Sequence, residues 1–161
     1  MWVDESSGYQ PVDRAAEPHR WCEAVYSDRV IVTQWDDGTV AWPQVGHRPT
    51  CSASMPSAVL GMLDVLDVQP GHRVLEIGTG TGYNAALLAE YLGDDQVSTI
   101  EVDPVLAGQA QARLTEAGYQ PTVICDDGAA GHQPTAPFDR VLATATVRVG
   151  NCLTRGWPKP P

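Results

Sequence analysis

Apolar residues in the second half of the chain alternate between short continuous runs and positions that recur every three or four residues. The runs have the length of buried strands, and the wider spacing is that of amphipathic helices. After residue 54 the pattern predicts three helices and four strands, at Met55–Leu66, Arg73–Ile77, Tyr83–Leu92, Val97–Val102, Val105–Ala117, Thr122–Cys125 and Phe138–Ala143. Strands that alternate with helices form parallel sheets with right-handed crossovers, so the predicted fold class is α/β.

The first 53 residues carry a weaker pattern and are predicted to form an N-terminal extension, residues 1–53. Residues 1–20 are polar and contain glycine and proline, so irregular backbone is expected there. Farther along, two runs with β-branched residues flank a turn signal and predict a possible hairpin. The predicted elements are a short helix at Trp21–Tyr26, strands at Val30–Thr33 and Thr39–Trp42, and a loop over residues 43–53.

The sequence VLEIGTGTGYN, residues 74–84, joins a predicted strand to a predicted helix through three alternating glycines, Gly78, Gly80 and Gly82. Glycine lacks a Cβ atom, so the backbone can turn sharply and approach a ligand closely. The start of the following helix also offers free N–H groups. Strand, glycine turn and helix in this order predict a site for a nucleotide-like cofactor. The alternative is a glycine-rich turn that holds no ligand.

The spacing of the glycines separates two classes of cofactor. Dinucleotide-binding turns have the pattern G-x-G-x-x-G, but Tyr83 takes the place of the third glycine here. The pattern that begins at Glu76, E-x-G-x-G-x-G, resembles motif I of class I S-adenosylmethionine (AdoMet) methyltransferases. The resemblance implies a Rossmann-like sheet and AdoMet as the cofactor, with Glu76 orienting the turn or meeting the cationic end of AdoMet. The cofactor-binding residues that it implies in this turn are Glu76, Gly78, Thr79, Gly80 and Gly82.

Acidic residues follow the next two predicted strands. Glu101 lies at the end of the second strand, 19 residues after Gly82, where nucleotide-binding folds place a carboxylate that accepts hydrogen bonds from ribose hydroxyls. The alternative is a solvated acid, with Asp103 as a competitor, although an acid before proline is typical of a helix cap. After the third strand, Asp127 and Gly128 are predicted to lie near the adenine amino group. The alternative there is a plain turn.

A segment upstream narrows the resemblance. The sequence TCSASMP at residues 50–56, which precedes a predicted helix and then motif I, resembles the protein-L-isoaspartate O-methyltransferase family. The family's serine in this segment lies beside the substrate carboxylate and the methyl group, and Ser54 is in its register. The alternative role for Ser54 is the N-cap of the helix that follows, for which Ser52 and Ser57 could compete.

The resemblance covers about residues 24–146 and departs from the family pattern at two places. Met55 stands where a polar residue is usual, and Asp126 stands where glycine usually precedes Asp-Gly. The implied reaction is methyl transfer to a carboxylate of a protein or peptide substrate, with L-isoaspartate or aspartate as the target. Two alternatives stay open: a non-catalytic remnant that serves as a cofactor-binding or interaction module, and a class I methyltransferase that acts on a small molecule.

The composition indicates which classes of partner and which cellular compartment to expect. Hydrophobic residues make up 43% of the chain, and the formal net charge is −10. An acidic surface disfavours nucleic acid, because phosphate binding needs clustered Lys and Arg. The sequence has no apolar run long enough for a membrane helix, and its cysteines and histidines show no metal-ligand spacing. We therefore expect a cytoplasmic protein with reduced thiols, no metal, and neither a membrane nor a nucleic-acid partner.

The last residues break with this composition. All 20 acidic residues lie before residue 146, and residues 147–161 are predicted to be an irregular, proline-rich tail. The resemblance implies a seven-stranded sheet, whereas the pattern predicts four strands. The sequence therefore predicts a partial AdoMet-binding domain over residues 54–146, truncated after the fourth strand, with little or no activity. The fourth strand would then leave an open edge for a partner or for self-association.

Overall fold

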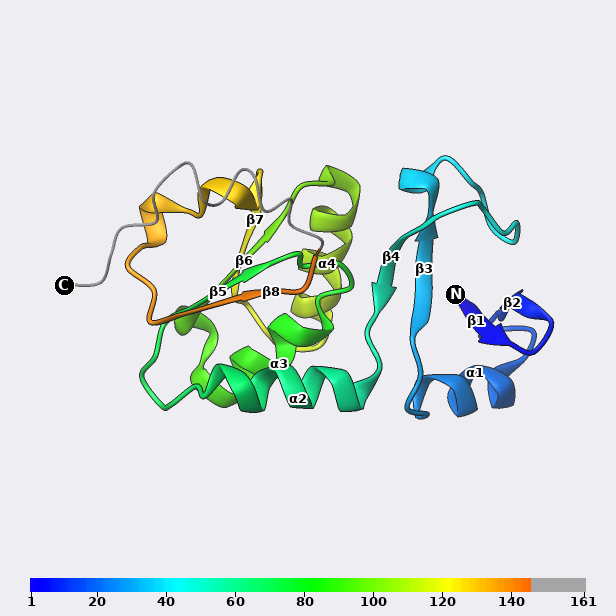
Figure 1. The fold of residues 1–161 in the computed structure, drawn as a ribbon, viewed down its shortest axis with the longest axis horizontal. Helices are drawn as coiled ribbons and strands as arrows, with labels where there is room; N and C mark the ends of the chain where they lie inside the picture. Colours follow the sequence, from blue (N-terminus) through cyan, green and yellow to red (C-terminus); the bar gives the residue numbers. More distant parts are fainter. Residues whose placement is uncertain (146–161) are drawn as a thin grey trace. The chain divides into compact units, whose positions relative to one another are not determined.

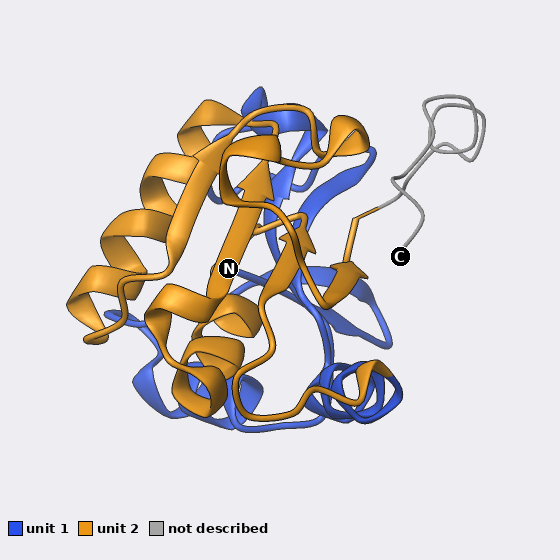
Figure 2. Ribbon diagram, turned by 90° about the vertical axis from the view of Figure 1, so that its left-hand side faces the viewer, with its two compact units in different colours: residues 1–65 blue, residues 66–161 orange. Residues whose placement is uncertain are grey.

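The computed structural model describes residues 1–145. The chain falls into two compact units, one of residues 1–65 and one that begins at residue 66 (Figure 2). Each unit has a sheet of four strands, labelled in Figure 1. The predicted tail at residues 147–161 lies outside the described residues, and the predicted domain boundary after residue 53 stays a prediction.

The sheet of the first unit is antiparallel, with the strand order β2-β1-β3-β4. Trp2 and Val3 are neighbours on β1, so their side chains point to opposite faces of the sheet. Trp2 is buried with Val32 and Trp35, and Val3 is buried in a separate cluster. The elements are β1 (Trp2–Glu5), β2 (Gly8–Pro11), α1 (Pro18–Val25), β3 (Ile31–Trp35), a 3-10 turn η1 (Asp36–Gly38), β4 (Pro49–Ala53) and α2 (Pro56–Leu66).

The prediction of irregular backbone over residues 1–20 is wrong, because this segment forms β1, β2 and the start of α1. Each strand has four residues, which is too short for an alternating pattern to stand out. All four residues of β1 pair with β2, and two of them also pair with β3, Trp2 with Val32 and Val3 with Ile31. The first strand is thus held by a local hairpin partner and by a strand about 30 residues away.

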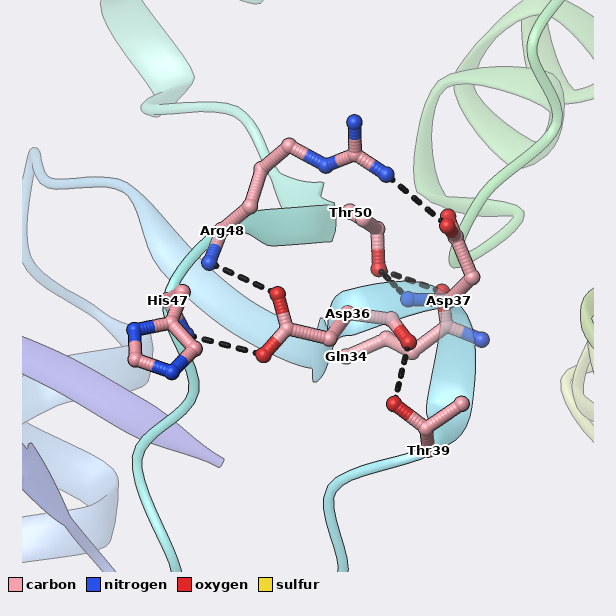
Figure 3. A network of polar contacts seen from close by, with 7 residues as sticks. All are labelled: Gln34, Asp36, Asp37, Thr39, His47, Arg48 and Thr50. Carbon is pink, nitrogen blue, oxygen red and sulfur yellow. Dashed lines mark hydrogen bonds and ion pairs between the residues drawn. The ribbon is translucent and has the colours of Figure 1, made fainter.

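The predicted strand at Thr39–Trp42 is also wrong, and the partner of β3 is β4, inside the predicted loop. Asp36 and Asp37 have φ angles of 46° and 54°, so the chain turns away from the sheet after β3. The Asp36 carboxylate then accepts hydrogen bonds from the backbone N–H groups of His47 (2.8 Å) and Arg48 (2.9 Å), as Figure 3 shows. These bonds close a loop over residues 36–48, and the chain re-enters the sheet only at β4.

The sheet of the second unit is parallel, with the strand order β7-β6-β5-β8. The central strands are buried, with Val74 and Leu75 fully inaccessible and all of β6 buried. This confirms the predicted α/β fold. The elements are β5 (Val74–Ile77), α3 (Tyr83–Leu92), η2 (Asp94–Gln96), β6 (Val97–Glu101), α4 (Pro104–Glu116), β7 (Thr122–Cys125), η3 (Gly128–Ala130), η4 (Gln133–Thr135) and β8 (Arg140–Ala143).

Two details of this unit bear on the predictions. Asp103 caps α4, since its carboxylate accepts hydrogen bonds from the backbone N–H groups of Val105 and Leu106. The cap proposed for Asp103 is therefore confirmed. Within residues 1–145, β8 pairs with β5 alone and is an edge strand. Pairing of this edge with a partner or a second copy stays a prediction.

Candidate functional site

The predicted glycine turn lies between β5 and α3. Gly78, Gly80 and Gly82 have positive φ angles of 100°, 52° and 83°, a region that residues with a Cβ atom rarely adopt. The backbone N–H groups of Gly78 and Thr79 both donate to the carbonyl oxygen of Ile100, at 2.8 and 3.2 Å. The turn is therefore fastened to the neighbouring strand β6.

Packing within the chain also leaves little room for a Cβ atom at two of these glycines. A Cβ atom on Gly78 would lie 2.7 Å from the Cβ of Ala145, which follows β8. A Cβ atom on Gly82 would lie 3.2 Å from Cγ of Leu114 on α4. Close packing therefore favours glycine at positions 78 and 82 whether or not a ligand is bound.

Glu101 ends β6 beside the turn. One carboxylate oxygen, Oε2, accepts a hydrogen bond from the backbone N–H of Gly80 at 2.9 Å, and Oε1 accepts one from Asp103 at 3.1 Å. The side chain is only 8% exposed. Each carboxylate oxygen has two lone pairs, so Glu101 can accept further hydrogen bonds while it holds the turn.

Glu76 lies on β5 directly opposite Thr99 of β6 and is the centre of a buried polar network. Its Oε1 accepts a hydrogen bond from Nδ2 of Asn84, and its Oε2 accepts one from Oγ1 of Thr99, both at 2.7 Å. The Thr99 hydroxyl also lies 2.6 Å from Oγ1 of Thr79 in the turn. Of the two roles expected for Glu76, this geometry favours orienting the turn.

The Glu76 carboxyl is almost completely buried, and this burial raises its pKa to about 7. The hydrogen bonds from Asn84 and Thr99 act in the opposite direction, because they favour the charged form. The negative charge of Glu101 raises the pKa of Glu76 further. The charge of Glu101 thus acts on Glu76 between the adjacent strands β6 and β5.

Asp127 and Gly128 follow β7. The Asp127 carboxylate accepts a hydrogen bond from the backbone N–H of Ala129 at 3.0 Å and caps η3. Asp127 therefore has the structural role in a turn that was the alternative to adenine binding. A Cβ atom on Gly128 would lie 2.5 Å from Cγ2 of Ile77, the last residue of β5. The loop after β7 thus reaches the end of β5, as expected where the carboxyl ends of parallel strands share one edge.

Ser54 lies in the first unit, between β4 and α2, and is half-buried. At the start of α2 the backbone N–H of Ser57 donates to Oδ1 of Asp28 at 2.8 Å. This hydrogen bond, together with one from the Ser57 side chain, holds the pKa of the Asp28 carboxyl below its usual value. A carboxylate from 29 residues upstream therefore satisfies this helix terminus.

Three residues of these arrangements were missed by the sequence analysis: Asn84, Thr99 and Asp28. Thr99 carries a usable signal, since it stands two positions before Glu101 and so shares a face of the strand with it. Asn84 lies two residues after Gly82, in the first turn of α3, where a polar residue is common. No local signal marks Asp28, because its partner is far away in sequence.

The sequence model of the family described as protein-L-isoaspartate(D-aspartate) O-methyltransferase matches residues 16–152. The chain belongs to this family. The suspected resemblance is thereby confirmed.

The protein-L-isoaspartate O-methyltransferase of Methanopyrus kandleri is 44% identical over 104 residues, which are 63% of this chain and 45% of the relative. That of Ignicoccus hospitalis is 42% identical over 106 residues, which are 65% of this chain and 49% of the relative. The chain spans about half the length of these curated relatives.

Solved structures agree on the fold of this methyltransferase-family chain. A protein-L-isoaspartate O-methyltransferase structure aligns with a TM-score of 0.66 and 28% identity, over 78% of this chain and 37% of the other. A dimethyladenosine transferase from Plasmodium falciparum, at 24% identity and a TM-score of 0.50, shares the fold over 56% of this chain and 32% of its own. The Rossmann-like methyltransferase sheet is therefore confirmed.

The part of the chain that the structure describes shows neither a metal centre nor a membrane-spanning helix. No cluster of three or more His, Cys, Asp or Glu side chains in this part is arranged to hold a metal ion. None of its helices combines the length and the apolar composition needed to cross a membrane.

The hydroxyl of Thr99 yields a direct prediction. Thr99→Val keeps the shape but removes the donor to Glu76, leaving a buried carboxylate oxygen and the Thr79 hydroxyl with fewer partners. We expect a loss of about 1–3 kcal/mol in the free energy of unfolding, measured by urea denaturation. The matched control is Thr122→Val on the neighbouring strand β7, where the side chain is exposed. Equal effects of the two substitutions would show that the network contributes nothing to stability.

Proposed function

We propose that the chain holds the AdoMet site of an O-methyltransferase that methylates a carboxylate of a protein or peptide, with L-isoaspartate as the target. The observation that carries this proposal is the 2.9 Å hydrogen bond between the backbone N–H of Gly80 and Oε2 of Glu101. It joins the glycine turn to the acid at the tip of the adjacent strand, where a carboxylate accepts ribose hydroxyls. Membership of the family supports the reaction type.

The hydrogen-bond donors of the turn suit a cofactor without phosphate groups. The N–H groups of Gly78 and Thr79 bind a carbonyl of β6, that of Gly80 binds Glu101, and that of Gly82 donates to the Thr79 carbonyl at 2.9 Å. Most N–H groups of the turn itself are therefore engaged, whereas the expectation of free N–H groups at the start of α3 stays a prediction. A pyrophosphate needs such donors, whereas AdoMet has no phosphate and needs acceptors for its ribose and adenine.

In this proposal each residue of the site has its own role in binding AdoMet. Glu101 accepts the ribose hydroxyls, Asp127 lies near the adenine amino group, and Glu76 with Thr79 keeps the turn in place. When bound, AdoMet supplies a methyl group on a positively charged sulfur. The carboxylate that receives the methyl group is already anionic, so no strong general base is needed and positioning supplies most of the rate. In this proposal the hydroxyl of Ser54 orients the substrate carboxylate.

Cofactor selectivity is the first test. Titration of the full chain with AdoMet, or with S-adenosylhomocysteine, is expected to raise its melting temperature in a concentration-dependent manner. NAD is expected to produce no shift, because Tyr83 replaces the third glycine of the dinucleotide pattern and most N–H groups of the turn are occupied. Saturable binding of NAD in the micromolar range would contradict the proposal.

Methyl transfer is the second test, with an isoaspartyl peptide as substrate and the aspartyl peptide of the same sequence beside it. Because little or no activity is expected of this chain by itself, Ser54→Ala is compared with wild type in a version extended to the length of the relatives. There it is expected to lower kcat by roughly ten- to a hundredfold, because a hydrogen bond to a charged group contributes about 1.5–3 kcal/mol. The dissociation constant of AdoMet should stay unchanged. Ser52→Ala, at an exposed position of β4, is the matched control. A Ser54→Ala variant with unchanged kcat would remove Ser54 from the substrate site.

A further inference from the structure

Glu76 and Glu101 are two buried carboxyl groups on the same face of the adjacent strands β5 and β6. They are 1% and 8% exposed. The hydrogen-bond donors to them are all neutral: the Asn84 amide and the Thr99 hydroxyl for Glu76, and two backbone N–H groups for Glu101. Within residues 1–145 neither acid forms an ion pair.

The charged groups on the surrounding elements are engaged elsewhere. Arg140 on β8 donates to the carbonyl oxygens of Leu66, Asp67 and Asp139. Arg113 on α4 donates to the side chain of Gln109 at 3.0 Å. On α3 the only described acid is Glu90, which accepts a hydrogen bond from Tyr119. Among residues 1–145, Glu101 is the charged group that raises the pKa of Glu76.

Burial of two unbalanced carboxylates is costly, so one of them binds a proton or a cation has to enter the site. The network around Glu76 contains an acceptor that could bind a proton carried by its carboxyl group. Oδ1 of Asn84 is buried and lacks a hydrogen-bond partner, while Nδ2 of the same amide donates to Glu76. Turning the amide over would place Oδ1 against Oε1 of Glu76, where a protonated carboxyl donates. The raised pKa of Glu76, about 7, agrees with this.

We propose that Glu76 is a positioning residue that carries a proton in the free protein and releases it to solvent when a cationic cofactor enters, so that cofactor affinity is coupled to pH. This inference rests on the proposed function, which places AdoMet at the turn. AdoMet brings a sulfonium and an ammonium group, and S-adenosylhomocysteine lacks the sulfonium. The O–H bond of Glu76 breaks, its proton goes to water, and the Asn84 amide turns back so that its Nδ2, together with the Thr99 hydroxyl, donates to the carboxylate.

The sign of the pH effect follows from the direction of proton movement. A site that loses a proton on binding gains affinity as pH rises, until the free protein is itself deprotonated. With a free-state pKa of about 7 for Glu76, affinity for AdoMet is lower at pH 6 than at pH 8, by about tenfold. Above this range the Glu76 contribution becomes constant.

The experiment is isothermal titration of the full chain with AdoMet and with S-adenosylhomocysteine at about pH 6, 7 and 8. Each pH is measured in two buffers of different ionisation enthalpy, which gives the number of protons released. We expect the wild-type protein to release protons near pH 6 and to bind AdoMet about tenfold more weakly at pH 6 than at pH 8. S-adenosylhomocysteine should show a smaller pH effect.

Glu76→Gln is the test variant, since glutamine cannot titrate and its amide can pair with the free Oδ1 of Asn84. In this variant most of the tenfold difference in AdoMet affinity between pH 6 and pH 8 should disappear. Any remaining difference would come from titrating groups on the cofactor. Glu116→Gln, at the exposed end of α4, should behave as wild type. An equal pH effect in wild type and Glu76→Gln would overturn the inference while leaving the proposed function intact.

Two further outcomes separate the inference from the proposed function. If Glu76→Gln does not fold, the proton count of the wild-type protein decides, and proton uptake or no release on binding would overturn the inference. If neither cofactor binds at any pH, the proposed function fails as well.

Discussion

Replacing Glu101 with alanine is expected to weaken AdoMet binding by more than tenfold. Two ribose hydroxyls would lose a charged acceptor, and hydrogen bonds to a charged group contribute about 1.5–3 kcal/mol each. The substitution also frees the backbone N–H groups of Gly80 and Asp103, which the carboxylate holds at 2.9 and 3.1 Å. The turn should therefore loosen at the same time. Isothermal titration at a temperature where the variant is folded measures the change in dissociation constant.

Two controls separate the ligand contact from the loosened turn. Glu116→Ala removes a carboxylate from the exposed end of α4 and should leave affinity unchanged. Glu101→Gln keeps one carbonyl acceptor and should bind AdoMet with intermediate affinity. Melting temperatures of the free proteins report how much the turn itself has weakened. Equal AdoMet affinity in wild type and Glu101→Ala would remove Glu101 from the site.

Replacing Gly78 with alanine is expected to lower the free energy of unfolding by about 2–5 kcal/mol. The φ angle of Gly78 is 100°, which strains any residue with a Cβ atom. That atom would also lie 2.7 Å from Cβ and 3.0 Å from the backbone nitrogen of Ala145. Neither cost can be relieved by rotating a long side chain, and typical domains have only about 5–15 kcal/mol in total. Urea denaturation followed by circular dichroism measures the change.

Gly108 offers a control with the opposite expected sign. It lies in the middle of α4, where an added Cβ atom would meet no atom within 4 Å. Gly108→Ala should therefore stabilise the protein by about 0.5–1 kcal/mol, because alanine loses less backbone entropy in a helix. A Gly78→Ala variant as stable as wild type would show that the segment after β8 does not pack against the turn.

The elements after residue 54 could be predicted because their signals are local. Each helix or strand there repeats its own burial pattern over several residues, as the buried run of β6 does. The first unit lacked such signals, since β1 and β2 have four residues each. Its loop after β3 was mistaken for a strand because the bonds from His47 and Arg48 to Asp36 join residues 11 and 12 positions apart.

In the candidate site, too, some features could be predicted from the sequence and others could not. The order of strand, glycine turn and helix placed the turn, and the common edge of parallel strands placed Glu101 next to it. The sequence did not show that Thr99, 23 positions from Glu76, would donate to its carboxylate. It also suggested a serine as the cap of α2, whereas the start of this helix is held by Asp28.

By itself the sequence determined the α/β class, the family resemblance and the position of the glycine turn, because periodicity and spacing are local properties of the chain. Only the tertiary structure decided which groups satisfy one another: Glu76 with Asn84 and Thr99, and the turn's N–H groups with β6. The physical reason is that buried polar groups must find hydrogen-bond partners. Strand register and packing choose those partners from segments that are distant in sequence.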